Sequence, residues 1–320
     1  MRGISVGYFY EKVKDDTRLS LVAGQKGFKR RIRVPEIERP GLAITGFFNY
    51  FAWRRVQVLG KVEIEYLRSL DSQTRLKRLR ELMESNIPCI IVSRNYIPPK
   101  ELVQEAERLN VSLFRSPMIT MNLIHRLTLF LDDEFAPTVS IPGNLMEVFG
   151  VGVLIKGRGG VGKSETSLGL IEKGHRLITD DVVKIKLREG RYLVGTGADL
   201  TKHHMEIRGL GIINVQALFG TVCFRKETQI ELVITLEPWD PDKEYDRLGI
   251  QEKMISILGR TISHITIPVR VGRDIVLLVE TAALNHRLKE TGYNPAKELN
   301  EKLMKVMSGE FKQDSGSRKG

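Results

Sequence analysis

The stretch Gly157-Arg158-Gly159-Gly160-Val161-Gly162-Lys163-Ser164 carries the most information about the fold of this chain. It lies between the apolar run 151–155 and a helix expected at 164–173, and this strand–loop–helix order is typical of a phosphate-binding loop. Glycines let backbone N–H groups point at phosphate oxygens, and the helix N-terminus adds positive charge. Lys163 would then reach the β- and γ-phosphates of a nucleoside triphosphate, and the Ser164 hydroxyl would bind Mg²⁺. The alternative is a glycine-rich turn that binds nothing.

Two adjacent carboxylates, Asp180 and Asp181, follow the apolar run 177–179, one helix downstream of the loop. Phosphoryl transfer to a hydroxyl needs a metal ligand and a group that accepts the hydroxyl proton, and this pair is the candidate for both. Adjacent residues of a strand point to opposite faces, so we expect only one of the two to face the nucleotide directly. The alternative is an acidic turn or a cap for a neighbouring element.

A length of 320 residues predicts two domains. Residues 1–132 read as an α/β domain, with strands expected at 4–7, 89–93 and 111–114 and helices at 64–85, 100–109 and 120–131. A charge run followed by proline at 132–137 marks the boundary. Residues 133–320 are richer in strands and predict a mixed sheet, with strands at 145–148, 151–155, 176–179, 182–187, 230–236 and 275–279 and helices at 164–173, 251–258 and 295–307.

Composition excludes several classes of protein. The hydrophobic fraction is 42% and the charged fraction 28%, and no apolar run approaches the length of a membrane span or of a secretory signal, so we expect a cytoplasmic protein. Cys89 and Cys223 lie far apart in apolar contexts, which excludes a disulfide framework, and the histidines lack zinc-site spacing.

The net charge of +11 is concentrated in short basic clusters at 29–33, 54–55 and 75–80. Leucines interleave the last cluster at helical spacing, which indicates the solvated face of an amphipathic helix. A nucleic-acid surface is the alternative, and we consider it less well supported because no aromatic platform accompanies the charge.

The chain resembles the HPr kinase/phosphorylase family over nearly its whole length. The segments that carry the resemblance are GKSETSL (162–168), KGHRLITDD (173–181), MEIRGLGIIN (205–214), PVRVGR (268–273), RPGL (39–42) and TGFF (45–48). The resemblance implies an N-terminal α/β domain like that of the Mur ligases. It also implies a C-terminal kinase domain with a phosphate loop and mixed sheet, resembling phosphoenolpyruvate carboxykinase, and assembly as a homohexamer.

The resemblance also implies roles for individual residues. Asp181 would accept the proton when a serine of the phosphocarrier protein HPr attacks ATP, and would return it in the reverse reaction, which consumes phosphate and yields pyrophosphate. Lys163 and Arg247 would hold the migrating phosphoryl group. Ser164 and Glu206 would bind Mg²⁺. The remaining residues of the phosphate-contacting loops would be Asp180, Arg208, Arg270 and Arg273.

Three departures from the family pattern concern the same chemistry. Pro142 stands where the family has an active-site histidine, and its side chain can neither donate nor accept a proton. Arg158 and Gly159 replace the usual acid and serine of the loop. Val271 and Asp274 alter the dephosphorylation segment, which bears on the phosphorylase direction more than on the kinase.

Two other functions remain open at this point. A phosphate-loop kinase that acts on a small metabolite would share the loop and the carboxylates. A nucleotide-sensing regulator without catalysis would use the basic surface to bind nucleic acid, with a steep dependence on salt.

Overall fold

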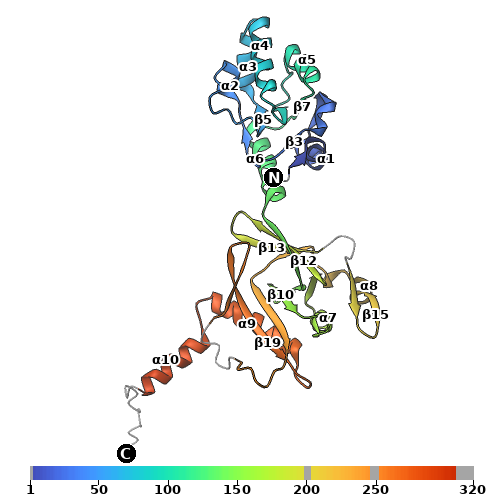
Figure 1. The fold of residues 1–320 in the computed structure, drawn as a ribbon, viewed down its shortest axis with the longest axis vertical. Coiled ribbons are helices and arrows are strands. Elements are labelled where there is room, and N and C mark those ends of the chain that lie inside the picture. Colours follow the sequence, from blue (N-terminus) through green and yellow to red (C-terminus); the bar gives the residue numbers. More distant parts are fainter. Residues whose placement is uncertain (1–2, 198–202, 246–251, 308–320) are drawn as a thin grey trace, which may run out of the picture. The chain divides into compact units, whose positions relative to one another are not determined.

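A computed structural model describes residues 3–197, 203–245 and 252–307 (Figure 1). The chain divides into two compact units, Met1–Ala136 and Pro137–Gly320. The helix that ends the first unit, α6 (Thr120–Phe135), continues through the charge run at which we placed the boundary. Ala136 then takes an extended backbone, with ψ of 135°, because the residue before a proline is disfavoured in helical conformation.

The N-terminal unit is built on a five-stranded sheet in the order β2-β7-β6-β5-β4. β4 to β7 are parallel, and β2 is antiparallel to β7. The strands are β2 (Ser20–Ala23), β4 (Ile37–Glu38), β5 (Val56–Leu59), β6 (Cys89–Val92) and β7 (Ser112–Arg115). A short antiparallel pair, β1 (Ile4–Ser5) and β3 (Arg31–Ile32), stands apart from this sheet.

Helices cover both faces of this sheet. Alternate residues of β6 show the two sides: Ile90 packs in one core with α3, α4 and α5, and Ile91 packs in the other with α1 and α6. In Figure 1, β5 and β7 lie between these two groups of helices. The helices are α1 (Val6–Thr17), α2 (Gly41–Thr45), α3 (Lys61–Ser69), α4 (Ser72–Glu84) and α5 (Lys100–Arg108), with a short 3-10 turn, η1, at Gln25–Lys29. The predicted α/β character of this half is therefore confirmed.

Two expectations in this unit were wrong in detail. The strand expected at 4–7 is cut short because Ser5 caps α1, accepting a hydrogen bond from the Tyr8 backbone N–H at 3.1 Å. The helix expected at 64–85 is two helices. Asp71 starts the second one by accepting hydrogen bonds from the Gln73 and Thr74 backbone N–H groups.

The C-terminal unit contains a six-stranded mixed sheet in the order β11-β9-β10-β17-β19-β18. Its central strands β10, β17 and β19 are parallel, and the others pair antiparallel. The strands are β9 (Asn144–Val148), β10 (Val151–Gly157), β11 (Arg176–Thr179), β17 (Leu232–Pro238), β18 (Met254–Ile257) and β19 (Arg260–Val269). The predicted mixed sheet is confirmed.

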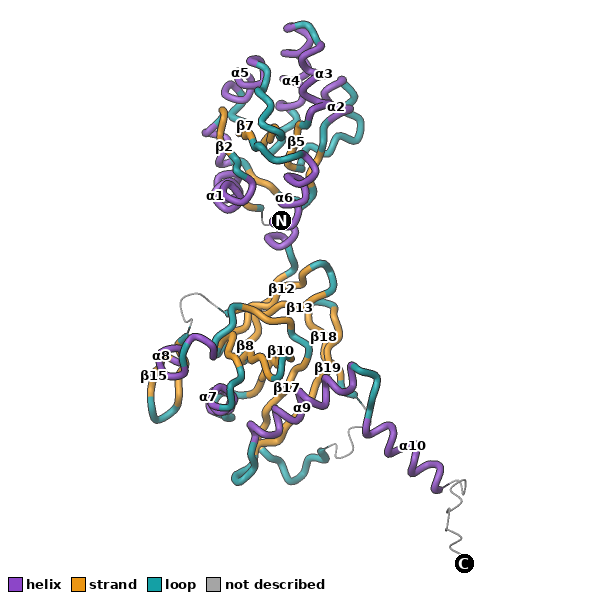
Figure 2. Tube along the Cα trace, turned by 180° about the vertical axis from the view of Figure 1, so that it is seen from behind, coloured by secondary structure: helices purple, strands orange, loops and turns teal. Residues whose placement is uncertain are grey.

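Each face of the mixed sheet has its own cover. One face packs on α7 (Lys163–Glu172) and α9 (Ile275–Glu290), and Figure 2 shows α9 beside β17 and β19. The other face packs on an antiparallel four-stranded sheet in the order β16-β13-β12-β8. Its strands are β8 (Thr138–Pro142), β12 (Val182–Arg188), β13 (Tyr192–Thr196) and β16 (Glu227–Gln229). The unit also has a hairpin of β14 (His204–Ile207) and β15 (Gly211–Asn214), α8 (Val215–Phe219) and α10 (Pro295–Met307).

Two further expectations are corrected here. The run 275–279, expected as a strand, opens α9, because Asp274 caps it by accepting a hydrogen bond from the Leu277 backbone N–H at 2.9 Å. The helix expected at 251–258 is instead the edge strand β18, which pairs with β19, and residue 251 lies outside the described range. Among the described helices, none is both long and apolar enough to cross a bilayer.

Candidate active site

The glycine-rich loop connects the C-terminal end of β10, a central strand of the mixed sheet, to the start of α7. Gly157 has a φ of 153°, and a Cβ there would lie 2.6 Å from the Leu236 carbonyl oxygen of the neighbouring strand. Gly162, with a φ of 101°, precedes the first residue of α7. Any side chain at Gly157 would therefore displace the loop, which explains the need for glycine at the strand end.

The first two residues of α7 present their side chains to this loop and to the acidic turn. The Lys163 ammonium donates hydrogen bonds to the Gly157 and Arg158 carbonyl oxygens, both at 3.1 Å. The Ser164 hydroxyl donates to the Asp180 carboxylate, with 3.2 Å from Oγ to Oδ1. The helix start therefore joins the loop to the acidic turn.

Asp180 and Asp181 form the turn between β11 and β12, which belong to different sheets. Asp181 has a φ of 70°, in the left-handed region, so the alternation of a regular strand does not apply. Its backbone N–H donates to Asn144 Oδ1 at 3.4 Å, and its carbonyl oxygen accepts from the Gly143 N–H at 2.8 Å. Asp181 lines the pocket beside the loop, whereas Asp180 is buried behind it in contact with Ser164, so one of the two carboxylates faces the pocket directly.

The two carboxylates differ in exposure and therefore in chemistry. Asp180 is buried, and burial together with the nearby negative charge of Asp181 raises its pKa to about 6. Hydrogen bonds from Ser164 and from the Glu206 backbone oppose that rise in the pKa. Asp181 is exposed and therefore open to a substrate that approaches from solvent.

The β14–β15 hairpin supplies the third side of the site. Glu206 and Arg208 line the same pocket, of about 160 Å³, as the loop and Asp181. The Arg208 guanidinium lies so close to Gly160 that a Cβ there would be 2.9 Å from Nη2. The pocket is lined by Gly159, Gly160, Gly162, Lys163, Ser164, Glu165, Asp181, Glu206 and Arg208. The structure thus brings together residues expected to contact phosphate from three separate segments.

Other expected residues are not in this pocket. The strands β10, β17 and β19 are parallel, so the loops that follow them all begin at the same side of the sheet, where the C-terminal ends of these strands lie. Arg270, in the loop after β19, lies over the Trp239 ring at 5.8 Å, and Arg273 donates to the Pro268 carbonyl oxygen at 3.4 Å. Neither lines the pocket. Arg247 lies outside the described residues.

The oxygen donors of the pocket suit Mg²⁺. The described residues contain no group of three or more His, Cys, Asp or Glu side chains placed to hold a metal ion. Magnesium, however, takes one or two protein carboxylates and completes its shell with phosphate and water oxygens. The Ser164 hydroxyl already contacts Asp180, and Glu206 lines the same pocket. The residues present therefore fit a magnesium–phosphate complex.

Sequence reasoning missed two residues of the site. Asn144 is fully buried at the start of β9, where its amide donates to Ser167 Oγ at 3.0 Å and its oxygen accepts from the Asp181 N–H. A polar amide next to apolar residues in a strand that also holds the carboxylate Glu147 is the signal that could have found it. Glu165 also lines the pocket, and nothing in its sequence context distinguishes it from a surface glutamate.

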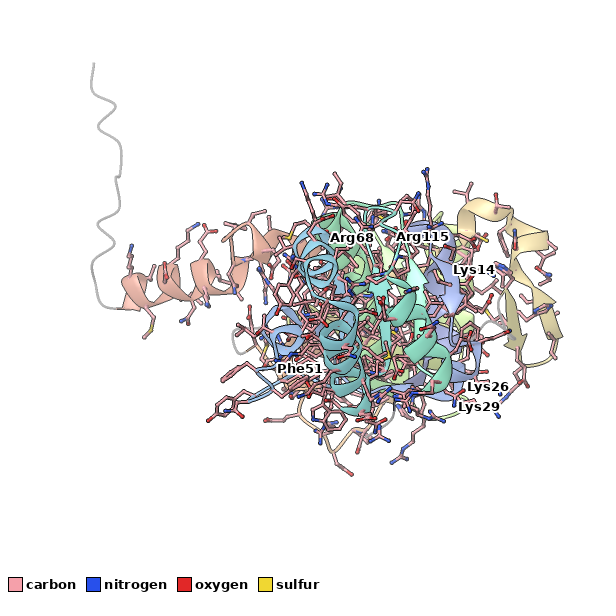
Figure 3. All side chains as sticks on the ribbon, turned by 90° about the horizontal axis from the view of Figure 1, so that it is seen from above. Lys14, Lys26, Lys29, Phe51, Arg68 and Arg115 are labelled. Carbon is pink, nitrogen blue, oxygen red and sulfur yellow. The ribbon has the colours of Figure 1, made fainter. Side chains whose placement is uncertain are left out.

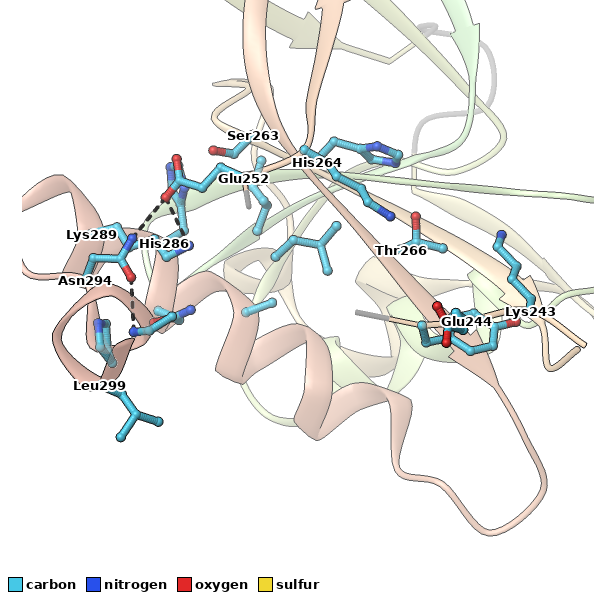
Figure 4. A pocket seen from close by; sticks show the side chains of 18 residues that line it. Lys243, Glu244, Glu252, Ser263, His264, Thr266, His286, Lys289, Asn294 and Leu299 are labelled. Carbon is cyan, nitrogen blue, oxygen red and sulfur yellow. Dashed lines mark hydrogen bonds and ion pairs between the residues drawn. The ribbon is translucent and has the colours of Figure 1, made fainter. Parts of the chain in front are cut away.

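A second pocket in the same unit, of about 460 Å³, lies between β19, α9 and α10. Figure 4 shows Glu252 beside Lys289 and Asn294, which contact it at 3.1 Å and 3.4 Å. None of its lining residues belongs to the pocket beside the glycine-rich loop.

Two family profiles match nearly the whole chain. The profile described as HPr Serine kinase N terminus matches residues 4–131, and the one described as HPr Serine kinase C-terminal domain matches residues 133–303. The chain belongs to the HPr serine kinase family. The resemblance drawn from the sequence segments is therefore confirmed.

Curated relatives of this HPr serine kinase family member are similar along most of their length. The HPr kinase/phosphorylase of Bacillus cytotoxicus is 46% identical over 290 residues, covering 91% of this chain and 94% of its own. That of Brevibacillus brevis is 43% identical, covering 88% and 91%. That of Alkaliphilus metalliredigens is 41% identical, covering 98% and 100%. The solved Hpr(Ser) kinase/phosphatase of Coxiella burnetii is 36% identical, covering 51% and 99%, with a TM-score of 0.45.

Proposed function

We propose that this protein transfers the γ-phosphoryl group of ATP to a serine hydroxyl of HPr. Its membership of the HPr serine kinase family and the names of its relatives support the choice of HPr. The observation that carries the chemistry is the shared pocket of the glycine-rich loop, Asp181 and Glu206. It offers a place for phosphate groups beside an exposed carboxylate.

In this proposal residues 157–164 form a phosphate-binding loop of the kind found in phosphoenolpyruvate carboxykinase. Its N–H groups and the start of α7 attract the triphosphate. The Lys163 ammonium group, which donates hydrogen bonds to two carbonyl oxygens of its own loop, turns to the β- and γ-phosphates when ATP binds. Arg208, over Gly160, adds a second positive charge at the same place. Arg247 would add a third and hold the migrating phosphoryl group together with Lys163. Fixed positive charge stabilises the transferring group.

Asp181 is the proton acceptor. The serine oxygen of HPr attacks the γ-phosphorus, the bond from that phosphorus to the bridging oxygen breaks, ADP leaves, and the serine proton passes to the Asp181 carboxylate. Asp181 is exposed, so a serine carried on another protein can reach it. Asn144 and Gly143 hold the Asp181 backbone and thereby fix the position of the carboxylate.

Ser164, Asp180 and Glu206 are the residues that would hold Mg²⁺. When bound, the ion neutralises charge that develops between the β- and γ-phosphates. Binding requires Asp180 to be ionised, and its raised pKa of about 6 still allows this at neutral pH.

The reverse reaction belongs to the same proposal. Inorganic phosphate would attack the phosphoserine phosphorus, Asp181 would return the proton to the serine oxygen, and pyrophosphate would form. Arg270 and Arg273 leave the sheet at the same edge as the loop, and their guanidinium groups suit phosphate oxygens. The protein would act in the cytoplasm, where ATP is available, and it would assemble as a homohexamer. Such an assembly would bury apolar residues of α10 that are exposed in the single chain, namely Leu299, Leu303 and Met304.

A labelling experiment tests the proposal. Incubation with γ-labelled ATP and purified HPr should label HPr, and a serine-to-alanine HPr should stay unlabelled. Equal labelling of both HPr forms would overturn the proposal. ATP consumption in the presence of small metabolites but not of HPr would indicate a metabolite kinase instead. Salt-sensitive binding to nucleic acid without any transfer would indicate a regulator.

A further inference from the structure

A basic pocket of about 180 Å³ lies in the N-terminal unit, far along the sequence from the loop and Asp181. It is lined by Arg30, Arg31, Arg33, Trp53, Arg54, Asn86, Ile87 and Pro88. The two basic clusters at 29–33 and 54–55, separate in the sequence, therefore contribute to one pocket. No lining residue is acidic.

The charge of this pocket is not neutralised. None of its four arginines forms an ion pair with an acidic side chain in the described part of the chain. The neighbouring Arg55, which does not line the pocket, is paired with Glu38 at 2.9 Å. Four like charges around one small hollow repel one another, and an anion would relieve that repulsion.

Arg30 makes the charge a fixed part of the fold. Its guanidinium donates to the carbonyl oxygens of Ile87, Asn110 and Leu109 at 2.7, 2.8 and 2.9 Å. All three acceptors are neutral, and burial lowers the pKa of Arg30 from its ordinary value. An uncompensated charge held in place in this way provides a permanent attraction for an anion.

The other three arginines are exposed and have donors to spare. Arg31 donates one hydrogen bond, to the Gly3 carbonyl oxygen at 2.6 Å. The Arg54 guanidinium lies over the Trp53 ring at 4.9 Å, which restrains its position. Guanidinium groups form paired hydrogen bonds with phosphate oxygens. In Figure 3, the labelled Lys26 and Lys29 belong to the same part of the chain, but neither lines the pocket.

We propose that this pocket binds the phosphate groups of a small phosphorylated molecule. A volume of 180 Å³ equals that of about six waters. That is room for a phosphate or pyrophosphate group. A nucleic-acid strand fits less well, because strands are held by successive aromatic platforms and Trp53 is the one aromatic residue of this pocket. The site is independent of the proposed kinase reaction.

The two tryptophans of the chain make the test direct, because Trp53 lines this pocket and Trp239 belongs to the other unit. In the full chain carrying Trp239→Phe, Trp53 alone reports by fluorescence. Titration with inorganic pyrophosphate and with ribose 5-phosphate should give a saturable change. If pyrophosphate binds more tightly, the bound phosphate is inorganic, and if ribose 5-phosphate binds more tightly, it belongs to a metabolite. Saturable binding of either compound supports the proposal. Adding Lys163→Ala should leave the change intact.

Matched variants distinguish phosphate binding in this pocket from a general attraction of anions to the positively charged surface. Arg33→Gln with Arg54→Gln should weaken binding roughly tenfold or more. Lys26→Gln with Lys29→Gln removes the same charge outside the pocket and should leave affinity within about twofold. Arg33→Lys with Arg54→Lys keeps the charge but loses the paired donors, so its affinity should fall between the two.

All four residues replaced in the glutamine variants are exposed, and circular dichroism of each variant verifies its fold. Equal affinity in both glutamine pairs would overturn the proposal. The absence of a saturable response to either phosphate compound would do the same, and so would a response confined to single-stranded oligonucleotides.

Discussion

The Ser164 hydroxyl oxygen lies 3.2 Å from Asp180 Oδ1, which ties the first turn of α7 to the turn between β11 and β12. This contact brings the glycine-rich loop beside a pair of carboxylates that occupy different surroundings. Asp180 is buried and Asp181 is exposed. The proposed division of roles rests on these surroundings, with Asp180 assigned to the metal and Asp181 to the proton.

Replacing Lys163 by alanine should lower the rate of transfer to HPr by roughly 10²-fold or more, because a fixed positive charge at the phosphates is lost. Lys226→Ala is the matched control, since Lys226 is exposed and does not line the pocket. Its rate should match that of the unmodified protein. Initial rates of phosphoserine formation measure both, and equal rates for the two variants would argue against a role for Lys163.

Asp180→Asn should raise the melting temperature at pH 7.5 in buffer free of nucleotide and magnesium. The folded-state pKa of Asp180 is about 6, above its ordinary value of 3.8, so above pH 6 the folded protein carries an unfavourable buried charge. Between these two pH values the folded state binds more protons than the unfolded state, so stability falls as the pH rises through this window.

The gain from Asp180→Asn should therefore be roughly 2–4 °C at pH 7.5 and clearly smaller at pH 5, where the native carboxyl is mostly protonated. Asp242→Asn, at an exposed site, should show no such pH dependence. Thermal melts at the two pH values provide the measurement. An increase in melting temperature that is larger at pH 5 than at pH 7.5 would contradict a raised pKa of Asp180.

Glu206→Gln should raise the magnesium concentration needed for half-maximal transfer roughly tenfold or more, because a neutral amide is a poorer ligand for a hard cation. ATP affinity measured at saturating magnesium should change less. Glu172→Gln, on the exposed side of α7, serves as the control. A magnesium dependence identical to that of the control would remove Glu206 from the metal site.

Pro142→His should raise the rate of phosphorolysis relative to that of phosphorylation, on the order of tenfold. Pro142 ends β8 and pairs with Val182, the residue after Asp181, so an imidazole there would lie beside the turn of Asp180 and Asp181. Both rates are measured on the same HPr. An unchanged ratio would mean that a proton-carrying group at this position has no part in the choice of direction.

The loop residues proposed to bind phosphate could be identified from the sequence alone. The loop, the strand before it and the helix after it form one continuous segment, and their order fixes their geometry. The meeting of Glu206 and Arg208 with this loop depends on a hairpin some forty residues downstream. Spacing within the sequence does not encode that contact, and the family resemblance pointed to it.

An apolar run without clear periodicity caused one of the errors in secondary structure. Residues 275–279 are all apolar and suit a strand or a helix equally, and the cap at Asp274 decides for the helix. Asp180 and Asp181 were expected to alternate as strand residues do. The left-handed φ of Asp181 instead turns the chain from β11 in one sheet to β12 in the other.

The most direct test of the account compares MgATP binding and phosphoryl transfer in the unmodified protein and in Asp181→Asn. Calorimetry should give MgATP affinities within about threefold of each other, because the substitution keeps the shape of the side chain and Asp181 is not needed to hold the triphosphate. Transfer to HPr should fall on the order of 10²- to 10⁴-fold, as expected when a proton acceptor is lost. Transfer by Asp181→Asn at the unmodified rate, or no MgATP binding by the unmodified protein, would contradict the account.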